Sequence, residues 1–305
     1  MALDPQIQPI VDTVNRAAQN APQNPSVEER RQGYLALVAF AGPGPQLDSV
    51  SDSTIPGPGG DIPVRIYRND GARGVFVFFH GGGYCIGDLD THDEVCRQLA
   101  DRIGCTVVAV HYRLAPEHPF PAGVEDCWAA MQWCDANREE LGGEGARLVV
   151  GGDSAGGNLS AVTSLMARDA GVEVAKQLLV YPGTRIDDES PSMEANGTGY
   201  ILERDTMDWF MESYKADPSD WRASPIYAES HAGVAPALVI TAEYDPIRDQ
   251  GRDYAEALAA AGVDVTHTDY DGMVHIFFQL GPIVNKGAAA VAEVASHARA
   301  ALHDD

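Results

Sequence analysis

Short apolar runs alternate with longer helical patterns along most of this chain, and this alternation limits the folds it can adopt. The runs are too short for helices and rich in Val, Ile, Leu and Phe, which is typical of strands buried on both faces of a sheet. The predicted strands are Ile62–Tyr67, Val75–Phe79, Thr106–Val110, Leu148–Val150, Leu178–Tyr181, Leu238–Thr241 and Val263–Thr268. The predicted helices are Thr91–Ile103, Gly123–Asn137, Asn158–Ala170, Arg252–Ala261 and Pro282–Leu302. This order predicts an α/β fold with a mostly parallel central sheet flanked by helices.

Two regions do not follow the alternation. Residues 1–41 predict two helices, because an apolar stripe recurs there with helical spacing and Ser26 with Glu29 forms a capping-box pattern. The second region is the stretch 182–236, which holds an aromatic-rich helical piece near 205–214. An insertion of this length in a compact domain is usually functional or covers another part of the molecule.

The charge balance excludes some classes of partner. The chain carries 21 Lys and Arg against 45 Asp and Glu, a net charge of −24. Such a surface repels phosphate groups, so nucleic acids and anionic membranes are poor partners. A small neutral substrate fits this surface better.

Cysteine usage and the N-terminal residues favour a cytoplasmic protein. The five cysteines are odd in number and form no CxxC pair, which favours free buried thiols over a disulfide framework or a metal site. The first residues show neither the basic nor the apolar part of a signal peptide. The apolar run Val75–Phe79 is too short to span a bilayer.

The segment Gly152–Gly156 matches the pattern G-x-S-x-G, with Ser154 at its centre. A predicted strand ends just before it and a predicted helix begins just after it, which is the context of a nucleophile elbow. In this sharp turn the serine takes a strained backbone conformation, and the positions two before and two after it must be very small. Gly152 and Gly156 satisfy that need, so Ser154 is the predicted nucleophile. The alternative is a glycine-rich turn with a capping serine.

Three glycines in a row follow His80, directly after the predicted strand Val75–Phe79. Glycines let backbone N–H groups face a ligand without obstruction. Beside a nucleophilic serine they predict an oxyanion hole, completed by the N–H of Ala155. The alternatives are a flexible loop or a phosphate cradle, although a cradle would favour a lysine or a helix directly after the glycines. We interpret His80 as a residue that positions this loop.

A serine nucleophile needs a base, and the base needs an orienting carboxylate. His275 is the best candidate base, because it follows the last predicted strand. Asp245 lies in the loop after the preceding strand, with Glu243 as a weaker rival, whereas Asp249 is predicted to cap the next helix. The order serine, aspartate, histidine is that of α/β-hydrolases. Among the other histidines, His267 lies in a strand pattern, and His297 and His303 lie in the C-terminal helix and tail.

The chain also resembles the bacterial hormone-sensitive-lipase-like family of serine esterases, and the resemblance extends over nearly its whole length. The matching motifs are His80–Gly83, Tyr112–Ala122, Gly152–Gly157, Asp245–Asp249 and Gly272–His275. His111 is a departure, since the family more often has Asp there, but it is not a catalytic position.

The resemblance implies the α/β-hydrolase fold and a carboxylesterase that acts on short- to medium-chain acyl esters without a cofactor. It implies the triad Ser154, Asp245 and His275, and oxyanion donors at Gly81, Gly82 and Ala155. It also implies one domain, 1–305, in which the helical segments 1–45 and 185–218 form a cap over a core of 46–184 and 219–305. Many members dimerise, so a homodimer is compatible with it.

Several further roles are predicted from position. The residues expected around the ester are Tyr84, Leu202, Trp209, Phe210, Tyr214 and Ile276. Arg113 and Glu117 are expected to form a structural ion pair. No metal is expected, because His92, Asp93 and Glu94 are adjacent on a helix and point in different directions, which favours a polar helix start.

The sequence is also compatible with two other functions. An amidase or peptidase could use the same triad, with His275 protonating the amine. A non-catalytic receptor on the same fold would not need His275 and Asp245, so their presence disfavours it.

Overall fold

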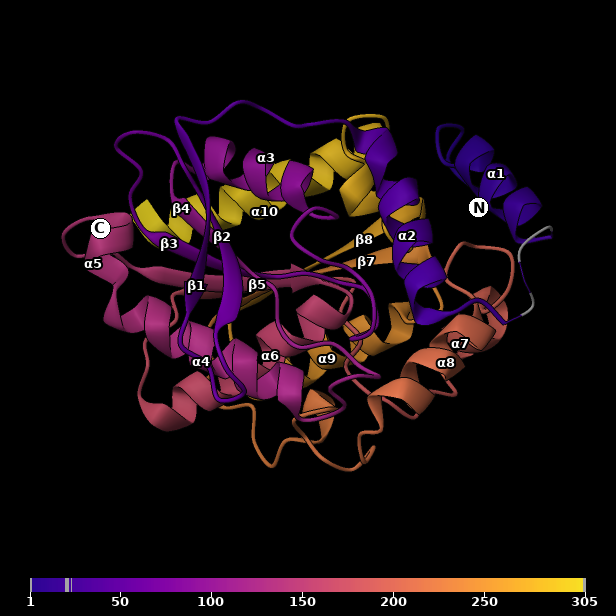
Figure 1. Cartoon of the computed structure of the whole chain (residues 1–305). Coiled ribbons are helices and arrows are strands. Elements are labelled where there is room, and N and C mark those ends of the chain that lie inside the picture. Colours follow the sequence, from indigo (N-terminus) through magenta and orange to yellow (C-terminus); the bar gives the residue numbers. More distant parts are fainter. Residues whose placement is uncertain (1, 20–21, 23, 304–305) are drawn as a thin grey trace.

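The computed structural model describes residues 2–19, 22 and 24–303, and within them an eight-stranded sheet runs through the centre of the molecule (Figure 1). The strands are β1 Ser49–Ile55, β2 Ile62–Arg68, β3 Val75–Phe79, β4 Thr106–Val110, β5 Leu148–Asp153, β6 Lys176–Val180, β7 Ala237–Tyr244 and β8 Val265–Val274. Their order is β1-β2-β4-β3-β5-β6-β7-β8. The pairs β1–β2 and β2–β4 are antiparallel and the others are parallel, which confirms the predicted mostly parallel sheet.

Strand prediction was accurate for β3 and β4 and failed most at the edges of the sheet. Strands β3 and β4 have the predicted bounds, and every residue in them is buried. Strand β1 was missed, because it lies at an edge and exposes most of its short polar side chains. Strand β8 is longer than predicted: it continues to Val274, which pairs with Tyr244 of β7 across an irregularity in register.

Helices cover both faces of the sheet (Figure 1). The α-helices are α1 Gln8–Ala18, α2 Val27–Val38, α3 Asp93–Ile103, α4 Ala122–Ala136, α5 Arg138–Gly142, α6 Ala155–Ala170, α7 Pro191–Asn196, α8 Arg204–Tyr214, α9 Arg248–Ala260 and α10 Asn285–His303. Short 3₁₀ turns are η1 Ala39–Ala41, η2 Pro225–Tyr227 and η3 Phe277–Leu280. Helices α3 and α10 pack on one face, and α4, α6 and α9 on the other, so the sheet is the middle layer of three.

Four helices gather at one end of the sheet, on the right of Figure 1: α1, α2, α7 and α8. Helix α2 begins with the predicted capping box, in which the Ser26 side chain accepts from the Glu29 N–H and the Glu29 carboxylate accepts from the Ser26 N–H. Helix α1 is anchored by Ile7 and Val11, which are buried in the main core. Helix α1 therefore packs against the core.

Within the described residues, no helix has the length and apolar character that crossing a bilayer requires.

Candidate active site

Ser154 occupies a sharp turn between β5 and α6. Its φ of 56° and ψ of −119° lie where residues other than glycine rarely occur. A Cβ at Gly152 would lie 2.1 Å from the Phe79 carbonyl oxygen, and one at Gly156 would lie 1.9 Å from the same atom. The two glycines are therefore required by the close approach of β3, as the sequence pattern predicts for a nucleophile elbow.

Three side chains from distant parts of the chain form one hydrogen-bonded series. The Ser154 Oγ lies 2.9 Å from His275 Nε2, and His275 Nδ1 donates to Asp245 Oδ2 at 2.6 Å. Asp245 is fully buried and His275 is 4% exposed. The N–H of Ile247 donates to the other oxygen of Asp245 at 2.9 Å and fixes the carboxylate. This series can move a proton away from the Ser154 hydroxyl.

The two acidic neighbours of Asp245 have other partners. Glu243 accepts from the N–H of Gly272 at 2.7 Å and does not take part in the series. The prediction that Asp249 caps a helix is wrong: α9 has Ile247 at its N-cap, and Asp249 lies inside the first turn. Its carboxylate instead accepts from the N–H of Ser192 and so ties α7 to α9.

The glycine loop after β3 differs from the prediction in one donor. The N–H of Gly81 donates to Oδ1 of Asp153 at 3.0 Å, so it is already occupied and the prediction of Gly81 as an oxyanion donor is wrong. In the part of the chain that the structure describes, no acceptor binds the N–H of Gly82, Gly83 or Ala155. Both Gly82 and Gly83 have positive φ, of 119° and 57°. Gly83 was not among the predicted donors, because the motif does not show which glycine faces Asp153.

His80 supports this loop. Its Nδ1 lies 2.9 Å from the Gly81 carbonyl oxygen, and its ring stacks on Tyr112 with centroids 4.4 Å apart. Burial and the nearby His92 hold the pKa of His80 well below its ordinary value. These contacts agree with a positioning role.

A buried polar network lies behind the loop and was not predicted. His92 is the N-cap residue of α3, in agreement with a polar helix start, but its ring is buried and its Nε2 lies 3.1 Å from Oδ1 of Asp153. Gln279 contacts the same ring nitrogen and also hydrogen-bonds the Tyr34 hydroxyl of α2. The network connects α2 with Asp153, the residue that precedes Ser154.

The predicted pair between Arg113 and Glu117 is wrong. Arg113 instead binds Asp126 of α4, with Nη2 to Oδ1 at 2.8 Å, and Glu117 binds Arg31 of α2 at 2.8 Å. Both residues lie in an irregular loop and not in a helix, so a separation of four residues does not bring their side chains together. The loop thus joins α4 on one side and α2 on the other.

Two cavities meet at Ser154. The larger, about 410 Å³, is lined by His275, by Gly82 and Gly83, and by apolar residues of α1, α2 and α8. The smaller, about 50 Å³, is lined by Ala155, Gly83, Met207 and Met211 among others.

The predicted ester-contacting residues divide between these cavities. Trp209 and Ile276 line the larger one, Tyr84 lines the smaller one, and Leu202 and Phe210 line both. Tyr214 lines neither: it is buried behind Tyr84, on which it stacks with ring centroids 3.9 Å apart. Its predicted contact with the ester is therefore wrong.

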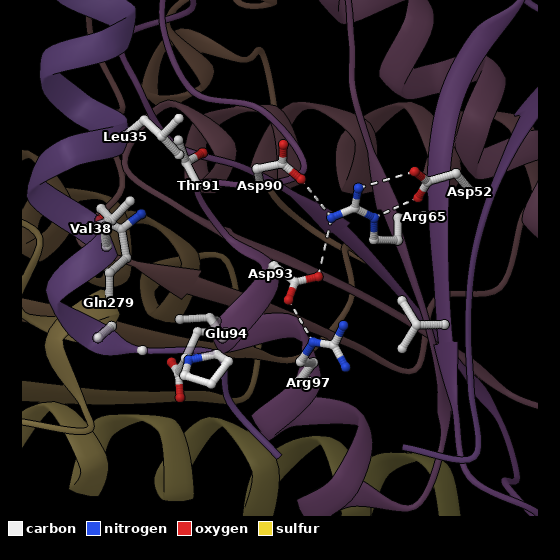
Figure 2. Close-up of a pocket in the computed structure, with 16 residues that line it drawn as sticks. Leu35, Val38, Asp52, Arg65, Asp90, Thr91, Asp93, Glu94, Arg97 and Gln279 are labelled. Atoms are coloured by element: carbon white, nitrogen blue, oxygen red, sulfur yellow. Dashed lines mark hydrogen bonds and ion pairs between the residues drawn. The ribbon is translucent and has the colours of Figure 1, made fainter. Parts of the chain in front are cut away.

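A third hollow, about 620 Å³, lies between α2 and α3 and does not reach Ser154 (Figure 2). Figure 2 shows Arg65 between Asp52, Asp90 and Asp93, and Arg97 bound to Asp93. The cations of this hollow are thus already paired with carboxylates.

Comparison with known proteins places this geometry in a family. The family model of the alpha/beta hydrolase fold matches residues 76–279. A carboxylic ester hydrolase of Mycobacterium tuberculosis, LipN, is 43% identical over 284 residues, which cover 89% of this chain and 76% of the relative. This chain belongs to the hormone-sensitive-lipase-like esterases of the alpha/beta-hydrolase family.

Other members of this esterase family agree with it over most of their length. The carboxylesterase NlhH of Mycobacterium tuberculosis is 45% identical over 253 residues, covering 80% of this chain and 79% of the relative. The solved structure of a Pyrobaculum calidifontis esterase superposes with a TM-score of 0.90 at 40% identity, and 98% of each chain is covered. The fold and the family predicted from the sequence are confirmed.

Proposed function

We propose that this esterase hydrolyses carboxylic esters through a triad of Ser154, His275 and Asp245. The Ser154 oxygen attacks the ester carbonyl carbon while His275 takes its proton, and Asp245 holds the imidazole and stabilises its charge. His275 then gives that proton to the leaving alcohol, and water hydrolyses the acyl-enzyme and releases the acid. The observation that carries this proposal is the hydrogen-bonded series of 2.9 Å and 2.6 Å through the three side chains.

The oxyanion of the tetrahedral intermediate needs N–H donors beside Ser154. We assign Gly82, Gly83 and Ala155, because their N–H groups have no acceptor in the described structure and all three residues line the cavities at Ser154. Gly81 has a different role in this proposal: its bond to Asp153 holds the loop at the elbow.

The two cavities suggest how the ester lies. His275 must protonate the departing alcohol, and His275 lines the larger cavity. We therefore assign the alcohol to the larger cavity and the acyl group to the smaller one, beside Met207 and Met211. This assignment favours short acyl chains, and the flexible methionines let the pocket adapt to somewhat longer ones.

The cap belongs to this proposal too. We infer that 1–45 and 185–218 form a cap over a core of 46–184 and 219–305. Residues of α1, α2 and α8 line the larger cavity and cover Ser154 with apolar side chains. Such a cover excludes water from the oxyanion hole, which strengthens its hydrogen bonds.

A homodimer is a further part of the proposal. Strand β8 is the last strand in the sheet order, so its outer edge can pair with a second copy. Light scattering at working concentration measures the molar mass and would show a monomer if this edge stays unpaired.

The proposed activity is tested with 4-nitrophenyl acetate and the variant Ser154→Ala. The wild type should hydrolyse the ester, and the variant should retain only the residual ~10³–10⁴-fold acceleration over water that binding and the oxyanion hole provide. Full activity in a correctly folded Ser154→Ala protein would contradict the proposal.

A further inference from the structure

The larger cavity contains one arginine whose charge is not neutralised. Arg30 of α2 lines this cavity together with Ser154, and its guanidinium carbon lies 4.3 Å from the centroid of the Trp209 ring of α8. Its Nε is buried and has no hydrogen-bond partner. Stacking on the ring holds the guanidinium plane in place and leaves its N–H edge free for a ligand.

Two nearby arginines have carboxylate partners, unlike Arg30. The next residue, Arg31, binds Glu117, and Arg65 in the third hollow binds three aspartates (Figure 2). In a chain with 45 acidic residues against 21 basic ones, carboxylate partners are abundant. No ion pair within 4.0 Å joins Arg30 to any described residue, so its charge remains available to a ligand.

Arg30 carries the accessible charge in the wall of the larger cavity. Its other residue that is normally charged at neutral pH is Asp153, which is 1% exposed and already bound by Gly81 and His92. Most of the remaining wall is apolar. In such surroundings a guanidinium binds a carboxylate through two parallel hydrogen bonds, because little water competes for either group.

We propose that Arg30 selects esters whose alcohol part carries an anionic group, such as a carboxylate. This inference rests on the proposed function and on the assignment of the alcohol to the larger cavity. Trp209 packs against the apolar body of the alcohol, and Arg30 binds the anion at its far end. Hydrolysis then releases a hydroxy acid together with the short-chain acid.

The test compares 4-acetoxybenzoate with its neutral methyl ester, methyl 4-acetoxybenzoate. The wild type should have the higher kcat/KM on the anionic ester, and Arg30→Gln should lower the anionic-to-neutral ratio by about tenfold or more, as loss of a charge-assisted hydrogen bond implies. Arg30→Lys should keep part of the preference. Arg222→Gln is the control, because Arg222 also stacks on an aromatic ring, Phe120, but does not line either cavity at Ser154.

A second measurement separates this inference from the proposed function. Titration calorimetry on Ser154→Ala, with and without Arg30→Gln, gives the Kd of both esters without turnover. Weaker binding of the anionic ester alone supports the inference even if the wild type hydrolyses neither ester. An anionic-to-neutral ratio that is the same with Arg30 and with Gln, in kinetics and in binding, overturns it.

Discussion

The backbone N–H of Gly81 donates to Oδ1 of Asp153 at 3.0 Å, directly beside the candidate nucleophile. This bond fixes the position of the glycine loop relative to the elbow. Asp153→Ala should therefore lower kcat by up to ~10², the lower range for loss of one oxyanion donor, while KM changes less. Asp153→Asn keeps an acceptor for Gly81 and should lose less. Equal kcat in the wild type and Asp153→Ala would show that the bond does not position the loop.

The oxyanion assignment is tested at Gly82. A Cβ there would lie 2.2 Å from the Ile86 carbonyl oxygen and displace the N–H, so Gly82→Ala should lower kcat by ~10²–10³. Gly60→Ala is a matched control, because Gly60 has a φ of 123° against 119° for Gly82 and its Cβ would meet open space. Similar losses of kcat in the two variants would attribute the effect to backbone strain alone.

The partners of Ser154 can be ranked by steady-state kinetics. His275→Ala should cost about as much kcat as Ser154→Ala, since the two side chains act as a unit. Asp245→Asn should cost the same or less, because His275 loses the carboxylate that orients it. Glu243→Gln should cost far less, since Glu243 binds the Gly272 N–H. A larger loss in Glu243→Gln than in Asp245→Asn would refute the assignment of the acid.

The acyl pocket is tested by enlarging it. Met207 lines the smaller cavity, so Met207→Ala should raise kcat/KM for 4-nitrophenyl hexanoate relative to the acetate. Each additional buried CH₂ is worth about 0.8 kcal/mol, or about fourfold. Val14→Ala, in the larger cavity, should leave this acyl-length ratio unchanged. If Val14→Ala shifts the ratio and Met207→Ala does not, the two cavities have been assigned in the wrong order.

Features set by short stretches of sequence could be predicted. The elbow depends on the glycines two before and two after Ser154, and β3 on five consecutive buried residues, so local patterns indicate both. The candidate acid and base could be predicted because their loops follow β7 and β8, which are neighbours in the sheet.

Features that depend on distant partners could not be predicted. Which glycine after His80 remains free depends on Asp153, 72 residues away from Gly81. Arg113 pairs with Asp126 of α4, and this contact depends on how the loop folds back onto the helix. Strand β1 has no apolar pattern of its own. Its place at the edge of the sheet is set by its pairing with β2, which its own residues do not indicate.

Covalent labelling of the nucleophile tests the central claim most directly. A fluorophosphonate reacts with a serine that is activated by a base, and peptide mass spectrometry locates the label. We expect one label per chain, on Ser154, and strongly reduced labelling in His275→Ala. A label on another serine, or equal labelling of Ser154 with and without His275, would contradict the account.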